Sequence, residues 1–198
     1  MNPRVPPAPS SREIITEAVL DVLSTRGADD LSVRKVAAAA GVSVGAVQHH
    51  FPTRAALIIG AMDAVTAHFH DRVGAALAGV DSAGERLSVF CEELAALGEA
   101  GRRDAIVWTA FASRAGTDPE VRAMHEREWR RTEEAVQMLL SEAYPAADIT
   151  ANDAGLLLAV LDGIAVARGA EGDGRMPPER GQRLVAAALA PFAARSVA

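Results

Sequence analysis

Apolar residues recur along the chain at the three- and four-residue spacing that one face of an α-helix produces. Ser10 and Glu13 stand at the spacing of a capping box before the first such stripe, and Gly27 follows it. The stripe consists of Ile15, Ala18, Val19, Val22 and Leu23. The pattern therefore predicts a first helix between the capping box and this glycine.

Two short helices are predicted next, joined by a three-residue turn. Ser32 can cap the first, Gly41 ends it, and Ser43 can cap the second. The inward positions of the first short helix are Val33, Val36, Ala37 and Ala40. Pro52 ends the second because proline disfavours helical geometry at the residue before it, and Thr53 can cap a long fourth helix.

Residues that start and end helices recur to the end of the chain. Asp118 followed by a proline opens a long helix to about Ala143, and further helices begin at Thr150 and Pro178. Before them, we expect one helix from about residue 83 to 97, ended by Gly98 and Gly101, and another that carries Val107, Trp108 and Phe111. No segment alternates like a strand and no internal repeat is visible, so the sequence predicts an all-α fold of about nine helices.

Composition supports a folded helical protein of 198 residues. Hydrophobic residues make up 49% of the chain, which excludes a disordered polypeptide, while aromatic residues make up only 4%. Cys91 is the only cysteine, so no internal disulfide forms, and we expect it to be a small buried hydrophobe. No apolar run is long enough to span a membrane, and residues 1–10, with four prolines, predict a disordered tail and no signal peptide. We expect a cytoplasmic protein.

Charge is distributed unevenly, although the whole chain carries −6. Residues 1–58 contain six basic and five acidic side chains, a net +1, and the remainder contains 14 basic and 21 acidic side chains, a net −7. Binding to a polyanion follows the local field over about one Debye length, so an acidic protein can bind one at its less acidic end. This asymmetry matters only if a binding motif lies in the same segment.

Such a motif is present, because two short helices joined by a glycine-containing turn form the pattern of a helix-turn-helix. Val42 and Val47 can anchor the second helix against the first. Its outward residues begin with small side chains, which permit close approach to a DNA groove, and end with Gln48, His49 and His50, which can hydrogen-bond to it. Taken alone, this pattern leaves DNA binding undecided.

A more specific likeness extends without gaps from about Arg12 to Phe69. The segment resembles the DNA-binding domain of the TetR family of bacterial transcriptional repressors. The matching residues are Ala40-Gly41-Val42-Ser43, Gly45-Ala46-Val47, His49-His50-Phe51 and Arg54-Ala55-Ala56-Leu57. At Gln48 the family usually has tyrosine, so the base preference at this step is open, and the glutamine could instead bond to adenine.

The resemblance implies DNA contacts, residue by residue. The first short helix would reach phosphate and a base edge, and the second would face the major groove with its residues up to His49. His50 and Arg54, the latter at the start of the fourth helix, would contact phosphates. The implied contacts are Ser32, Arg34, Val44, Gly45, Ala46, Gln48, His49, His50 and Arg54. The implied division is a helix-turn-helix domain over residues 11–53 and a ligand-binding and dimerisation domain over residues 54–198.

Two enzymatic readings compete with this one. Residues 41–45 spell the G-x-S-x-G string of α/β-hydrolases, but that motif needs a strand before Ser43, and an alanine-rich helical run precedes it. A helical di-iron site needs Glu-x-x-His pairs, but no histidine of this chain has Glu three residues before it. His68 and His70 are two residues apart, so they cannot share a helix face. We therefore expect no enzyme, no metal site and no cofactor.

The remaining helices resemble the family's regulatory domain only in number and order. This implies a homodimer that binds a palindromic operator and is released by a small-molecule effector; an activator or a ligand-independent regulator is the alternative. The candidate effector lining is Met62, Phe69, Phe90, Trp108, Phe111, Met124 and Met138, and the low aromatic content favours an apolar or amphipathic effector.

Residues 154–166 are apolar on nearly all faces, which indicates either a dimer helix or an internal core helix. The candidate dimer contacts are Leu157, Leu161, Ile164, Leu184, Ala188 and Phe192.

Overall fold

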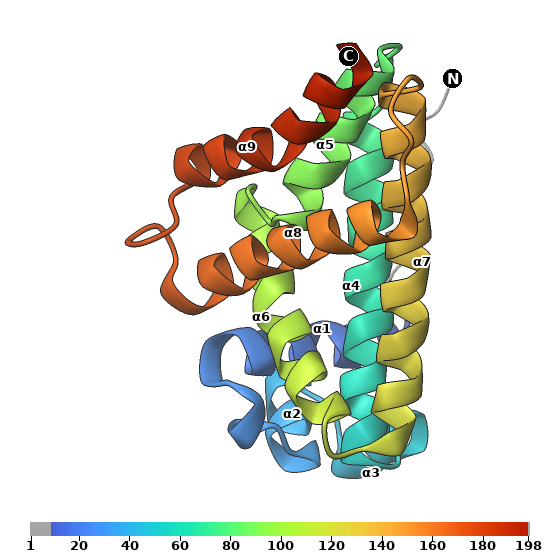
Figure 1. Ribbon diagram of the computed structural model, residues 1–198. Coiled ribbons are helices and arrows are strands. Elements are labelled where there is room, and N and C mark those ends of the chain that lie inside the picture. The colour runs from blue at the N-terminus through green and yellow to red at the C-terminus, as the bar shows by residue number, and fades with distance from the viewer. Residues whose placement is uncertain (1–8, 198) are drawn as a thin grey trace, which may run out of the picture.

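The computed structural model describes residues 9–197, and within them nine α-helices and one short 3-10 helix are joined by brief turns (Figure 1). The predicted all-α class is thereby confirmed. Residues 1–8, on which most of the predicted disordered tail falls, and Ala198 lie outside the described residues. The helices are α1 (Ser11–Arg26), η1 (Ala28–Asp30), α2 (Val33–Ala40), α3 (Val44–His50), α4 (Arg54–Ala76), α5 (Ala83–Leu94), α6 (Glu99–Ala115), α7 (Pro119–Ala143), α8 (Ala151–Glu171) and α9 (Pro178–Val197).

Side-chain caps fix the starts of most helices where the sequence predicted them. Ser10 and Glu13 form a reciprocal capping box at α1, and Asp118 accepts two backbone N–H groups at the start of α7. The same kind of cap begins α2, α3, α4, α5 and α8, with the capping residues Ser32, Ser43, Thr53, Ser82 and Thr150. Each cap satisfies backbone donors that would otherwise be unpaired.

One predicted boundary is wrong. The helix expected to continue to residue 97 ends at Leu94, and a turn with Ala96 at a φ of 54° leads into α6. Gly101, expected to end a helix, lies inside α6, where a Cβ would stand 2.9 Å from the Ala96 Cα. The glycine therefore permits a close approach of two backbones, a tertiary requirement that local sequence signals do not reveal.

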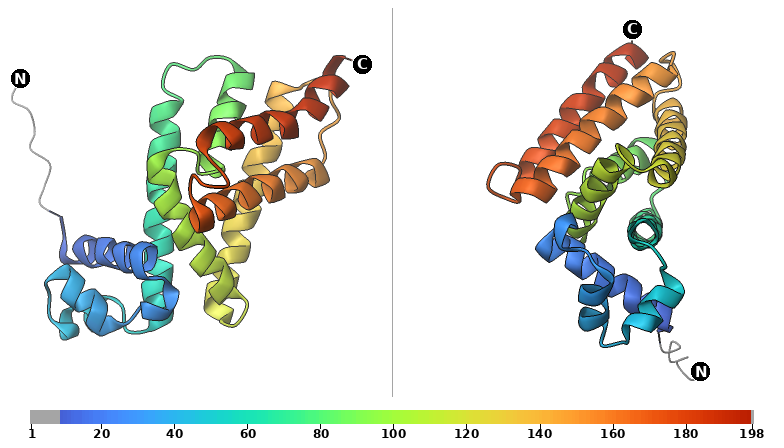
Figure 2. Two further views of the ribbon diagram at one scale, coloured as in Figure 1. Left: turned by 90° about the vertical axis from the view of Figure 1, so that its left-hand side faces the viewer. Right: turned by 90° about the horizontal axis from the view of Figure 1, so that it is seen from below.

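Two large hydrophobic clusters stabilise the described residues, and α4 contributes to both. The first joins α1–α3 to α4 and to parts of α6 and α7; the second joins α5, α7, α8 and α9. We call α1–α3 the head. Figures 1 and 2 show the head at one end of the molecule and α8 beside α9 toward the other. Cys91 is fully buried in the second cluster as expected, and burial raises the pKa of its thiol to about 12.

The head packs against α4 through the aromatic ring of Phe51. Phe51, the C-cap of α3, is 2% exposed, and its ring lies against Gly60 of α4, where a Cβ would overlap the ring. The Arg12 guanidinium lies over the same ring, 5.2 Å from its centroid. A glycine at position 60 thus sets how closely α3 approaches α4.

We expect Gly60→Ala to lower the free energy of unfolding by about 1–3 kcal/mol, because the buried Phe51 ring must shift. The control is Gly74→Ala on the same helix, where an added Cβ meets no atom within 4 Å. There, alanine should instead stabilise the protein by up to about 1 kcal/mol through its higher helix propensity. Urea unfolding followed by circular dichroism measures both changes, and equal effects of the two substitutions would contradict the prediction.

Candidate functional site

The α2–α3 pair is built by a tight left-handed turn. Gly41 has a φ of 67°, a conformation that glycine adopts without strain, and the Val42 N–H donates to the Ala37 carbonyl at 3.0 Å. Val36 and Val47 are completely buried and hold the two helices on the first hydrophobic cluster. The Ser43 hydroxyl accepts the Ala46 N–H at 3.1 Å, so the serine of the G-x-S-x-G string caps a helix that follows another helix.

The outer face of α3 presents the predicted DNA contacts to solvent. Val44 is 41% exposed, Gly45, Gln48 and His49 are exposed, and Ala46 is half-buried. His50 is also half-buried, and its ring meets that of His49 edge to face at 5.1 Å between centroids. This arrangement places small side chains at the start of the helix and hydrogen-bonding side chains at its end.

Basic and hydroxyl groups border this face. Ser32 and Arg34 are exposed at the start of α2, and the Ser32 oxygen accepts the Lys35 N–H at 3.4 Å, which leaves the hydroxyl hydrogen free to donate to a phosphate. Arg54 begins α4 and donates one N–H to the Ala28 carbonyl. A guanidinium has five N–H donors, so the others can still reach a phosphate.

Two basic residues near this face were absent from the predicted set. Lys35 forms an ion pair with Asp30, which lowers the pKa of that carboxyl, and its side chain is 42% exposed. Arg12 lies over the Phe51 ring. The sequence offered only their charge as a signal, because their positions relative to α3 depend on how α1 and α2 pack.

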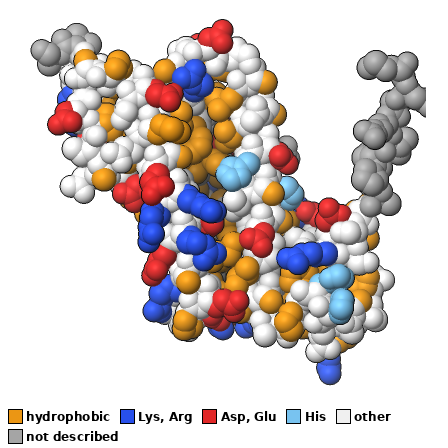
Figure 3. Space-filling model, turned by 90° about the vertical axis from the view of Figure 1, so that its right-hand side faces the viewer, with side chains coloured by type: hydrophobic (Ala, Val, Ile, Leu, Met, Phe, Trp, Pro, Cys, Tyr) orange, Lys and Arg blue, Asp and Glu red, His pale blue; other side chains and the backbone are white. Residues whose placement is uncertain are grey.

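A second site is a cavity of about 230 Å³ lined by residues of α4, α5, α6, α7 and α8 and of the turn before α6. Figure 3 views the face on which a hollow with an apolar floor lies among acidic and basic side chains. Four predicted residues line this cavity: Met62, Phe69, Phe90 and Trp108.

Three predicted lining residues lie elsewhere. Phe111 and Met124 are buried in the first hydrophobic cluster and do not line the cavity. Met138 is 57% exposed on the surface of α7. The stripe of methionine and aromatic residues therefore includes core and surface positions, since helical spacing alone does not distinguish a cavity from a packed interface.

Four of the residues that line the cavity are phenylalanine or tryptophan: Phe69, Phe90, Trp108 and Trp129. Trp108 stacks with His125 at 5.0 Å and with Trp129 at 6.5 Å between centroids, and both angles between ring planes are below 20°. Phe69 and Phe90 meet edge to face at 5.6 Å. The low aromatic content of the chain did not reveal this concentration, because the rings come from four helices.

Charged side chains complete the lining, and all of them were missed by the sequence prediction. The carboxylates are Glu93, Asp104, Glu128 and Asp162, and the guanidiniums are Arg72 and Arg131. Arg72 donates to Glu93 at 2.9 Å and to Asp104 at 2.7 Å, and burial raises the pKa of Asp104. Asp162 accepts the Trp108 indole N–H at 2.5 Å. Counted formally, this lining has an excess of two negative charges.

Most of the predicted dimer residues lie inside the single chain. Leu157, Leu161, Ile164 and Phe192 are buried within the second cluster of the single chain. Ala188 is half-buried and packs against that cluster, and Leu184 alone of the six is exposed, at 37%. Because α8 is apolar on several faces, its periodicity did not indicate which face turns inward.

A different face of α8 is exposed. Leu156 is 67% and Val160 38% exposed, and Ala159 and Gly163 lie on the same side. These four residues are three or four positions apart and so form one continuous strip, which we call the α8 outer strip. It contains no charged side chain.

Among residues 9–197, no helix has the length and hydrophobicity that crossing a bilayer requires. In the same part of the chain, no three His, Cys, Asp or Glu side chains are grouped so that they could hold a metal ion.

Comparison with known proteins agrees with the geometry. Residues 15–61 match the family model described as bacterial regulatory proteins of the TetR family, and residues 83–194 match the C-terminal model of BetI-type transcriptional repressors. Over 122 residues the chain is 25% identical to the HTH-type transcriptional regulator BetI of Rhizobium meliloti (strain 1021), a match that spans 62% of this chain and 60% of that protein.

Solved structures show the same fold over nearly the whole chain. A transcriptional regulator from Rhodococcus sp. Rha1 is 30% identical, with 92% of this chain and 96% of that one covered and a TM-score of 0.80. A protein from Saccharomonospora viridis, crystallised in complex with choline, is 20% identical, with 91% and 95% covered and a TM-score of 0.79; it shows the fold alone. With its helix-turn-helix head and its matches to both family models, the chain belongs to the TetR family of bacterial transcriptional regulators, with a C-terminal region of the BetI type.

Proposed function

We propose that the protein is a homodimeric repressor that binds a palindromic duplex through α3 and releases it when a small organic cation occupies the cavity. The observation that carries this proposal is α4, which packs against the head at its start and lines the cavity farther along. A ligand that binds better to one position of α4 must shift the population of head positions by that difference in affinity.

The outer face of α3 supports major-groove binding. Its small side chains allow the helix backbone to approach base edges, and Gln48 and His49 supply donors and acceptors beside them. Arg54 and Lys35 lie at the border, where phosphates would run. The head thus separates side chains suited to base edges from side chains suited to the backbone.

The cavity supports a cationic ligand. Arg72 is shared between two carboxylates and leaves one negative charge uncompensated, and the ion pair of Glu128, at 3.4 Å, is with an arginine whose side chain is 73% exposed. Asp162 accepts the indole N–H of Trp108, and the Trp108 ring stacks with that of Trp129. Aromatic rings therefore lie beside the carboxylates of the cavity lining. Carboxylates beside aromatic faces attract organic cations, and choline is the ligand in the complex from Saccharomonospora viridis.

The α8 outer strip supports the homodimer. It is uncharged and exposed, and a two-fold axis would place it against its copy, with α9 beside it (Figure 2). The small residues Ala159 and Gly163 would permit close helix approach. This strip replaces the four buried leucine, isoleucine and phenylalanine positions expected from sequence.

For DNA binding, we expect Gln48→Ala and His49→Ala to lose about 1–3 kcal/mol of discrimination between the best duplex and its single-base variants. Arg54→Ala should weaken all duplexes alike and reduce the salt dependence by about one charge. The duplex is first selected from a random pool by the full chain, and affinities are then measured by fluorescence anisotropy. Gln182→Ala, an exposed glutamine on α9, is the control. Unchanged discrimination in both α3 variants would contradict the assignment of α3 to the groove.

For the effector, choline is compared with its neutral isostere, in which a quaternary carbon replaces the nitrogen. Both tryptophans of the chain line the cavity, so their fluorescence reports occupancy. We expect the isostere to bind about tenfold more weakly or worse, because it lacks the attraction of the charge to aromatic faces and carboxylates.

Glu128→Gln should weaken choline binding, whereas the matched Glu134→Gln, exposed on the same helix and outside the cavity, should not. Choline should also release the selected duplex. Equal binding of both compounds, or of neither, would contradict a cationic effector. Retention of the duplex by the choline-bound protein would contradict the repressor mechanism.

For the dimer, Val160→Asp should produce monomers, because two carboxylates would be buried against each other across the axis. The control is Ile14→Asp on α1, at almost the same exposure, 39% against 38%. Sedimentation velocity measures the mass of each. A Val160→Asp protein that sediments as the wild type does would contradict the α8 outer strip as the interface.

A further inference from the structure

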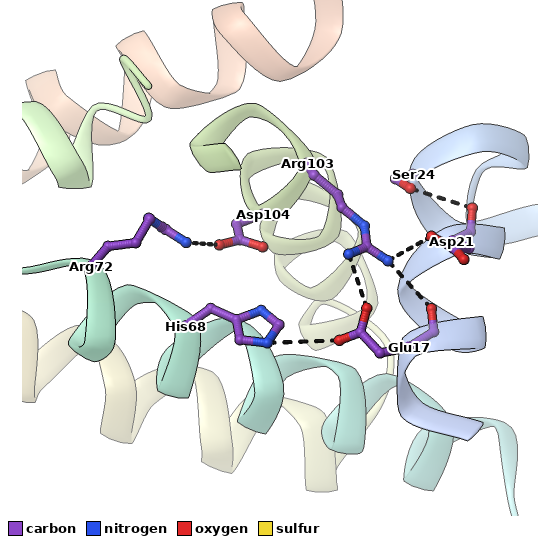
Figure 4. A network of polar contacts seen from close by, with 7 residues as sticks. All are labelled: Glu17, Asp21, Ser24, His68, Arg72, Arg103 and Asp104. Carbon is purple, nitrogen blue, oxygen red and sulfur yellow. Dashed lines mark hydrogen bonds and ion pairs between the residues drawn. The ribbon is translucent and has the colours of Figure 1, made fainter. Parts of the chain in front are cut away.

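Three consecutive residues near the start of α6 bind three different helices. The Arg102 Nε donates to the Arg168 carbonyl of α8 at 3.2 Å, Arg103 binds α1, and Asp104 accepts from Arg72 of α4. Figure 4 shows Arg103 and Asp104 leaving α6 on opposite sides, one toward the head and the other toward Arg72. This turn of α6 therefore connects the head with helices that line the cavity.

On the head side, Arg103 forms several contacts with α1. It donates to the Glu17 carboxylate at 3.1 Å, to the Glu17 backbone carbonyl at 3.3 Å and to the Asp21 carboxylate at 2.6 Å. The same Glu17 carboxylate lies 3.7 Å from the His68 Nε2 of α4. A planar guanidinium that binds two carboxylates and a carbonyl defines a direction as well as a distance, so α1 is oriented relative to α6.

On the cavity side, Asp104 is 7% exposed and lines the cavity together with Gly101, Ala105 and Trp108 of the same helix. Its partner Arg72 is also a lining residue and is shared with Glu93 of α5. Any group that enters the cavity and competes for these carboxylates acts on a residue directly adjacent to Arg103.

The start of α6 can respond to such a change. Its N-cap, Gly98, makes no side-chain capping bond, and the turn before it contains Ala96 at a positive φ. The beginning of α6 thus depends on the three tertiary attachments of Arg102, Arg103 and Asp104, in its first two turns, more than on local capping.

We propose that Arg103 is a positioning residue that couples the cavity to the head, so that a rearrangement of the Arg72–Asp104 pair is transmitted through α6 to α1. This inference rests on the proposed function, in which cavity and duplex binding are linked. Arg103 is 33% exposed and its partners Glu17 and Asp21 are 50% and 68% exposed, and ion pairs this exposed contribute little to stability. Its removal should therefore change coupling more than folding, with α4 transmitting the remainder.

The test is a double-mutant cycle that requires no ligand. Arg72→Met, which disrupts the cavity-side pair, is introduced into the wild type, into Arg103→Met and into Arg86→Met. Arg86 on α5 is the matched control, because its side chain is 32% exposed and it also makes an ion pair with another helix. It donates to the Glu142 carboxylate of α7 at 3.0 Å and to the Asp81 carbonyl. The readouts are amide hydrogen exchange of residues 11–26 and affinity for the selected duplex.

We expect Arg72→Met to speed exchange in α1 by about threefold or more in the wild type and in the Arg86→Met background. In the Arg103→Met background the same substitution should have little further effect, and duplex affinity should show the same non-additivity. If Arg72→Met does not fold, Arg72→Lys replaces it, since lysine keeps the charge but cannot bridge both carboxylates in the same geometry.

An effect of Arg72→Met that is equal in the wild-type and Arg103→Met backgrounds, or absent from α1 in both, would overturn the inference. Hydrogen exchange separates this failure from that of the proposed function. A protein that binds no duplex but shows non-additive exchange refutes the function and retains the coupling. A protein that binds the duplex but shows additive exchange retains the proposed function and refutes the coupling.

Discussion

The structure depends on one helix being part of two hydrophobic clusters. Leu57 and Ile58, near the start of α4, are completely or almost completely buried against the head, whereas Phe69 and Val73, farther along, pack on the second cluster. A hydrogen-bonded helix of 23 residues moves nearly as a rigid body. A displacement of the part of α4 that lines the cavity would therefore also act on the contacts of α4 with the head.

The parts of this fold that are encoded locally could be predicted from the sequence. A cap such as Ser43 and a turn glycine such as Gly41 act within a few residues of chain, so their effect is visible in the order of residue types. The helix-turn-helix consists almost entirely of such signals, which is why its caps, turn and anchors were placed correctly. Gly60 and Gly101 have the same local freedom, but their purpose is contact with Phe51 and Ala96, and only packing reveals it.

The sequence does not show which side of an apolar helix is buried, and α8 illustrates the reason. Leu157 and Leu161 are buried and Leu156 and Val160 are exposed, yet all four are aliphatic and a helical wheel gives no preference between the two strips. The choice is made by neighbours, since α6, α7 and α9 cover one side only. The cavity presents the same difficulty, because its carboxylates lie on α5, α6, α7 and α8 and converge only after folding.

Adjacent charges in a sequence are commonly interpreted as a solvated surface, and Arg103 beside Asp104 invites that interpretation. Successive side chains on an α-helix point about 100° apart, so neighbours in the sequence serve different surroundings. Here one residue faces the exposed carboxylates of α1 and the next is almost buried at the cavity wall. A helix that lies between a cavity and a neighbouring domain can thus connect the two through a pair of adjacent residues, provided that the partners of these residues lie on opposite sides of the helix. The electrostatic link between cavity and head is short because it crosses α6 instead of running along it.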